Sequence, residues 1–85
     1  MATLLIGRWT DEHTLTVTES HPVPNGDQEA IGALVAAARD ADPEMDWACE
    51  FPVDAHRDAV QRAYEEFARD DDADVVDDVE HYAAL

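Results

Sequence analysis

Residues 45–51, with the sequence MDWACEF, alternate between large apolar side chains and small or acidic ones. This alternation is the strictest in the chain, and a period of two residues is typical of a β-strand with one buried face. Pro52 follows at once and closes the segment, since proline has no backbone N–H for a strand ladder. We therefore predict a β-strand here, with one face lined by Met45, Trp47, Cys49 and Phe51.

Two further strands are predicted near the N-terminus, over residues 3–10 and 14–20. The first contains a continuous apolar run at residues 4–6, followed by Trp9. The second alternates threonine with Leu15 and Val17. Residues 11–13 are few and polar, as in a hairpin loop. The continuous apolar run favours a central position for the first strand, with both of its edges paired.

Two helices are expected, separated by the third strand. Residues 21–26 (HPVPNG) break the second strand, and a helix follows over residues 27–41, capped by Asn25 or Asp27 and ended before Pro43. A second helix is predicted from an Asp54 cap to about residue 70. The apolar faces of these helices consist of Ile31, Leu34, Val35 and Ala38 in the first and Val60, Ala63, Tyr64 and Phe67 in the second.

The last segment begins with an acidic interruption at residues 70–74. In a strand, Asp77 would fall on the same face as Val75 and Val79, so a short C-terminal helix is the better prediction. Its apolar positions are Val75, Val76, Val79, Tyr82 and Ala83.

These elements predict a single α+β domain that spans residues 1–85, with the order β-β-α-β-α and the short final helix. A right-handed crossover through the first helix places the third strand beside the first. The expected architecture has two layers. One is a three-stranded antiparallel sheet of order 2-1-3, and the other holds the helices on one face of that sheet.

The charge of the chain is strongly one-sided. It has 21 Asp and Glu residues against five basic residues, all of them Arg, and a formal net charge of −16. This Asp-rich, Lys-free composition, with much Ala and Val, resembles that of cytoplasmic proteins of halophilic archaea. The resemblance covers the whole chain but concerns composition alone. It implies a cytoplasmic protein adapted to high salt and surrounded by solvent cations. The single Cys49 fits a reducing interior.

Several classes of function are not supported by the sequence. Asp70, Asp72 and Asp74 match the start of a calcium loop, but Val75 and His81 stand where that loop needs Gly and Glu. The histidines and the cysteine show no ligand-pair spacing, so we expect no metal and no cofactor. The arginines are dispersed, so we expect no nucleic-acid binding. No apolar run approaches a membrane span, so we expect no membrane association.

Four side chains remain as candidates for a ligand site or an interface: Trp9, Trp47, His56 and Cys49. His56 precedes Val60 by one helical turn, which favours either a packing histidine or a ligand or acid–base group on the apolar side of the second helix. Cys49 shares a strand face with Trp47. Its thiol is either buried and inert or reactive. Either tryptophan belongs to the core or to an interface.

The first functional hypothesis is a non-catalytic interaction or oligomerising domain whose partner is a second copy, in a homodimer, or another protein. The first strand has Leu4 and Ile6 on one face and Leu5 and Trp9 on the other, and a two-layer monomer would leave one face uncovered. The alternatives are a small-ligand or metal-binding regulator centred on His56 and Cys49, and a small enzyme. For an enzyme, the sequence shows no nucleophile, base and orienting group together.

Folding is predicted to require salt. Carboxylates on so small a surface repel one another at low ionic strength, and molar salt shortens the screening length to about 3 Å. Near-UV circular dichroism should be lost below a few hundred millimolar KCl and recovered above about 1 M. An equally stable cooperative fold in dilute buffer would contradict the charge argument.

Overall fold

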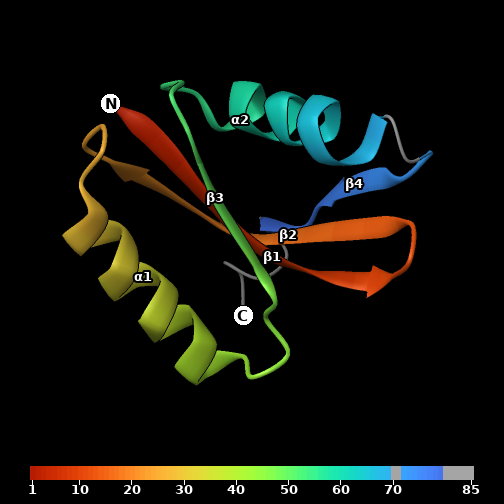
Figure 1. Ribbon diagram of the computed structural model, residues 1–85, viewed down its shortest axis with the longest axis horizontal. Helices are drawn as coiled ribbons and strands as arrows, with labels where there is room; N and C mark the ends of the chain where they lie inside the picture. The colour runs from red at the N-terminus through yellow and green to blue at the C-terminus, as the bar shows by residue number, and fades with distance from the viewer. Residues whose placement is uncertain (70–71, 80–85) are drawn as a thin grey trace.

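A computed structural model describes residues 1–69 and 72–79 of the chain (Figure 1). It has the α+β class expected from the sequence. The elements in chain order are β1 (Ala2–Asp11), β2 (Thr14–Val23), α1 (Gln28–Ala41), β3 (Trp47–Phe51), α2 (His56–Ala63), the π-helix η1 (Tyr64–Ala68) and β4 (Asp74–Asp77).

The sheet contains four strands in the order β3-β1-β2-β4. β1 pairs antiparallel with both β2 and β3, which confirms the order 2-1-3 of the predicted strands. The prediction of three strands, all antiparallel, is wrong because β4 adds to β2 in parallel. Residues 74–77 therefore form a strand, where residue 74 was predicted to end the acidic interruption and residues 75–77 to begin a short helix. Backbone pairing with residues 14–17 outweighs the helical spacing of the valines. Tyr82 and Ala83 lie outside the described residues.

The helices cover opposite faces of the sheet, which corrects the prediction that both lie on one face (Figure 1). The connections explain this arrangement. β2, β3 and β4 all run in the same direction, because β2 and β3 are both antiparallel to β1 and β4 is parallel to β2. α1 joins β2 to β3 across the sheet, and α2 joins β3 to β4 on the way back. Right-handed crossovers in opposite directions require opposite faces.

Each face of the sheet has its own apolar core. β1 contributes to both, since Leu5 faces α2 whereas Leu4 and Ile6 face α1, and all three are buried. The α2-side core consists of Leu5, Leu15, Val17, Trp47, Phe51, Ala59 and Ala63. The α1-side core consists of Ala2, Leu4, Ile6, Val23, Ala38 and Met45. The expected uncovered face is therefore absent from the described part of the chain, and Trp9 packs half-buried against the α2-side core.

The third strand is shorter than predicted, and its alternation ends at Trp47. Met45 lies before the strand and turns to the α1-side core, away from Trp47 and Phe51. The edge-to-face contact between Trp47 and Phe67, with ring centroids 5.4 Å apart, ties β3 to η1.

Both helices lie where they were predicted, but only the predicted cap of α1 is confirmed. α1 begins after Asp27, whose side chain accepts a hydrogen bond from the Ala30 N–H, and it ends at Asp42. α2 begins at His56 after Ala55, so the predicted Asp54 cap is wrong; Asp54 instead lies 3.2 Å from the terminal amine of Met1. Tyr64, predicted on the apolar face, is exposed.

A β-bulge changes the direction of the side chains along β2. Ile6 pairs with Glu19 and Gly7 with Val17, so Thr18 is an extra residue on β2. Because of this insertion, Val17 faces α2 whereas Val23 faces α1. The strand also continues through Pro22, where we predicted a break. Proline is tolerated there because the described pairing of β4 covers only residues 14–17.

Gly7 allows the close approach of β1 and β2 at this bulge. A Cβ atom on Gly7 would clash with the Thr16 carbonyl oxygen and would lie 3.1 Å from the Val17 Cα, both of which are backbone atoms. We therefore expect Gly7→Ala to destabilise the protein by about 2 kcal/mol or more in chemical denaturation.

The matched control for this substitution is Gly32→Ala in α1. A Cβ at Gly32 meets nothing within 4 Å, so alanine should stabilise the helix by about 0.5–1 kcal/mol. Equal unfolding midpoints for the two variants would contradict the close approach at Gly7.

Candidate functional site

His56 joins three elements that are distant in sequence. It is the first residue of α2, and its Nδ1 lies 2.9 Å from the Ser20 Oγ on β2. Its Nε2 lies 2.7 Å from Oδ2 of Asp77, the last residue of β4. The other carboxylate oxygen of Asp77 accepts a hydrogen bond from the Val79 N–H at 3.3 Å. Ser20, His56 and Asp77 are hereafter called the serine cluster.

The direction of each hydrogen bond in the serine cluster follows from its chemistry. A carboxylate only accepts, so the proton of neutral His56 lies on Nε2 and is donated to Asp77. Nδ1 then carries a lone pair and accepts a hydrogen bond from the Ser20 hydroxyl. This is the arrangement in which a histidine can act as a base toward a serine.

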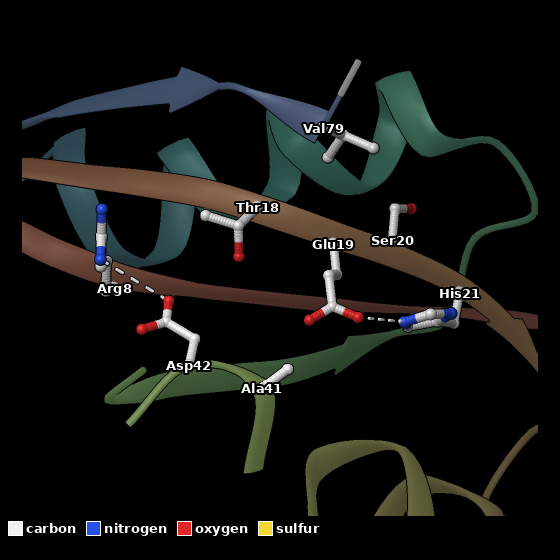
Figure 2. Close-up of a pocket in the computed structure, with 8 residues that line it drawn as sticks. All are labelled: Arg8, Thr18, Glu19, Ser20, His21, Ala41, Asp42 and Val79. Atoms are coloured by element: carbon white, nitrogen blue, oxygen red, sulfur yellow. Dashed lines mark hydrogen bonds and ion pairs between the residues drawn. The ribbon is translucent and has the colours of Figure 1, made fainter. Parts of the chain in front are cut away.

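The serine cluster is open to solvent. The side chains of His56 and Asp77 are 36% and 42% exposed, and Ser20 is half-buried. Ser20 also borders a cavity of about 600 Å³ that lies along β2. Figure 2 shows the Ser20 hydroxyl turned away from Glu19 and His21, which point to the opposite face of the strand.

That opposite face holds a separate set of charges. His21 Nε2 lies 3.0 Å from Glu19 Oε1 (Figure 2). Arg8 on β1 forms ion pairs with Asp42 at 3.6 Å and with Glu44 at 2.9 Å. These contacts tie the C-terminal end of α1 to the sheet, and they engage the arginine in carboxylate pairing.

A second hollow, of about 520 Å³, lies between α1 and the outer edge of β3. Its apolar wall includes Leu4, Ile31, Val35 and Met45. Arg39 and Glu50 also border it. Within residues 1–69 and 72–79, β3 pairs only with β1, so its outer edge faces this hollow without a strand partner.

The four residues singled out from the sequence do not form one site. Trp47 belongs to the α2-side core, and Trp9 and Cys49 pack against that core. His56 has Ser20 and Asp77 as its hydrogen-bond partners rather than Cys49. Among the described residues, no group of three or more His, Cys, Asp or Glu side chains is arranged to hold a metal ion. The pairing of His56 with Cys49 as a ligand site therefore has no geometric support.

Sequence reasoning identified His56 but not its partners. Ser20 is the only serine in the chain, and it stood at the end of a predicted strand before a turn. Asp77 stood in a predicted helix among many other acidic residues. The one available signal was the presence of a serine, a histidine and an aspartate in a small chain, which is too common to indicate a cluster.

Burial raises the pKa of the Cys49 thiol above its usual value, and the carboxylates of Glu66 and Glu50 raise it further. The thiolate is therefore scarce at neutral pH, and alkylation by iodoacetamide should be slower than in a free cysteine peptide and should accelerate only at higher pH. Glu66→Gln should speed the reaction at pH 8, measured at the lowest salt that keeps the protein folded. Glu65→Gln serves as control, because Glu65 is not among the charges that act on Cys49. An alkylation rate equal to that of the peptide would contradict the raised pKa.

No described helix is long and apolar enough to cross a membrane. Comparison of the chain with protein-family models, with curated proteins and with solved structures found no match. The function therefore has to be argued from the geometry of the serine cluster and of the open β3 edge.

Proposed function

We propose that this protein is a self-associating interaction domain of a salt-rich cytoplasm, and that two copies pair through the outer edges of β3. The observation that carries the proposal is the unpaired edge of β3 within the described residues. Unpaired N–H and C=O groups along a strand edge are a template for another strand. Antiparallel addition of a second β3 would continue the sheet from one molecule into the next.

The two edges of the sheet differ in charge. β4, at one edge, begins and ends with Asp74 and Asp77, and such charges discourage pairing. β3, at the other edge, has only Glu50 as a charged residue, and its Oε2 accepts a hydrogen bond from the Gly26 N–H at 3.2 Å. Since β3 contains no proline or lysine either, it is the edge better suited to association.

The backbone directions support pairing through Ala48 and Glu50. The Trp9 N–H donates to Asp46 beside β3, whereas the Ile6 carbonyl accepts from Thr18 on β2. The backbone N–H and C=O groups of the odd-numbered residues of β1 therefore point toward β3. These residues pair with the odd-numbered residues of β3. Alternation along a strand then directs the N–H and C=O groups of residues 48 and 50 outward.

A two-fold axis at Cys49 gives the register with the longest overlap. It pairs all five residues of β3, with Trp47 opposite Phe51 of the second copy and Ala48 opposite Glu50. Like charges do not meet in this register. The apolar wall between α1 and β3 would be covered as well, and this burial favours association.

The charge of the protein makes this association dependent on salt. Two copies of net charge −16 repel each other, and the Glu66 carboxylate acts on Cys49 close to the proposed axis. Molar salt screens these charges over about 3 Å, whereas hydrogen bonds and apolar contacts across the edge persist. Homodimer formation should therefore strengthen from low to high salt.

Sedimentation in about 2 M KCl tests the proposal. The wild type should be dimeric at high micromolar concentration. Ala48→Pro should be monomeric, because it removes an outward N–H while leaving the ladder to β1 intact. Ala48→Ser retains that N–H and should remain dimeric. A monomeric wild type, or a dimer that survives Ala48→Pro, would refute pairing through β3.

Oxidation of Cys49 provides a second measurement. In the proposed register the two Cys49 residues face each other as a non-hydrogen-bonded pair, with Cα atoms about 4.5 Å apart. This separation allows a disulfide. Diamide should therefore produce a covalent dimer, at a rate limited by the raised pKa of the thiol. The Ala48→Pro variant should not cross-link, and cross-linking at an equal rate in that variant would contradict the register.

A further inference from the structure

The serine cluster has the connectivity of a nucleophile, a base and an orienting group. The Ser20 hydroxyl donates to His56 Nδ1 over 2.9 Å, and His56 Nε2 donates to Asp77 Oδ2 over 2.7 Å. The carboxylate is itself held by the Val79 N–H. This sequence of contacts is the one by which a histidine base, oriented by a carboxylate, activates a serine nucleophile. The ring uses Nδ1 toward the serine and Nε2 toward the aspartate, and both nitrogens can serve as the base.

The β-bulge at Thr18 aims Ser20 at this histidine. Without the extra residue, the alternation along β2 would place residue 20 on the same face as Thr16, away from α2. With it, Ser20 pairs with Leu5, which faces α2. Bulges that redirect a side chain are common next to active sites. Gly7 permits the close approach of the two strands beside the bulge, so the glycine and the bulge together set the direction of the Ser20 side chain.

We propose that the serine cluster is a hydrolytic site and that Ser20 is a nucleophile toward small, neutral carboxylic esters. The partial exposure of all three side chains gives both substrate and water access to the hydroxyl. Neutral substrates fit the surroundings, because the Asp77 carboxylate lies 2.7 Å from His56 and repels an anion at contact distance even where salt screens the more distant charges. Arg8, whose charge could attract an anion, lies on the other face in carboxylate contacts.

The reaction balances with an ester and water as the only reactants. Ser20 Oγ bonds to the ester carbonyl carbon while His56 Nδ1 takes the hydroxyl proton. The resulting imidazolium is stabilised by Asp77. The bond from that carbon to the leaving oxygen then breaks, and the proton on Nδ1 passes to the leaving alkoxide, which departs as an alcohol. Water attacks the acyl-serine with the same histidine as base, which releases the carboxylic acid and restores Ser20.

A neutral alkyl fluorophosphonate tests the nucleophile directly. Ser20 Oγ displaces fluoride from phosphorus, and the adduct is read from the intact mass and located by peptide mapping. Because Ser20 is the only serine, the assignment is unambiguous. In about 2 M KCl we expect folded wild type to be labelled and Ser20→Ala and guanidinium-unfolded wild type to be unlabelled. Release of p-nitrophenol from p-nitrophenyl acetate should follow the same pattern.

The base and the orienting group are tested by variants with matched controls. His56→Gln and Asp77→Asn should slow labelling of Ser20 by about 10²-fold or more. His21→Gln should leave the rate unchanged, because that ring contacts Glu19 on the other face. Asp78→Asn is the control for the neighbouring position. Near-UV circular dichroism establishes that each variant is folded.

Three outcomes would overturn the proposal. The first is folded wild type that is not labelled. The second is labelling that is equally fast in the unfolded chain. The third is a folded His56→Gln variant that reacts at the rate of the wild type. In each case the serine cluster only joins β2, α2 and β4. Because Ser20 and the β3 edge are tested by different variants, failure here leaves the proposed dimer untouched.

Discussion

The architecture depends on the burial of β1 on both of its faces. Leu5 faces one helix, and Leu4 and Ile6 face the other, so exposure of either face of this strand to water would be unfavourable. Each face needs a cover, and the crossovers from β2 to β3 and from β3 to β4 supply one each when both are right-handed. A small, Ala-rich chain thereby builds two thin cores that share a central strand. β1 pairs with a strand along each of its edges and contacts both α1 and α2.

The bulged pairing of β1 with β2 links the packing of the sheet to the position of the serine cluster. The missing side chain of Gly7 lets the strands approach, and the extra residue at Thr18 reverses the facing of the chain that follows. Leu15 and Val17 can thus serve the α2-side core while Val23 serves the α1-side core. The same reversal brings the one serine to the N-terminal end of α2. Packing and the serine cluster therefore have a common local cause.

Charge is distributed unequally over the edges of the sheet. The β4 edge carries carboxylates, whereas β3 is apolar apart from one glutamate that is hydrogen-bonded within the molecule. In dilute buffer the charge of the whole surface would oppose the proposed association, and in molar salt the difference between the edges would favour contact at β3. High salt would thus act in two ways, by stabilising the thin cores against repulsion and by permitting contact at β3.

The sequence by itself determined the three principal strands, the extent of α1 and the α+β class, because side-chain period, proline and capping residues act over a few neighbouring positions. It also determined the charge and singled out His56. Tertiary structure alone decided that residues 74–77 form the strand β4, because these residues are stabilised by backbone pairing with residues 14–17 and not by their own side-chain pattern. That missing strand hid the second crossover, and with it the placement of the helices on opposite faces. The contacts of His56 with Ser20 and Asp77 were decided in the same way. They join positions 36 and 21 residues apart, and they depend on a bulge that no local pattern encodes.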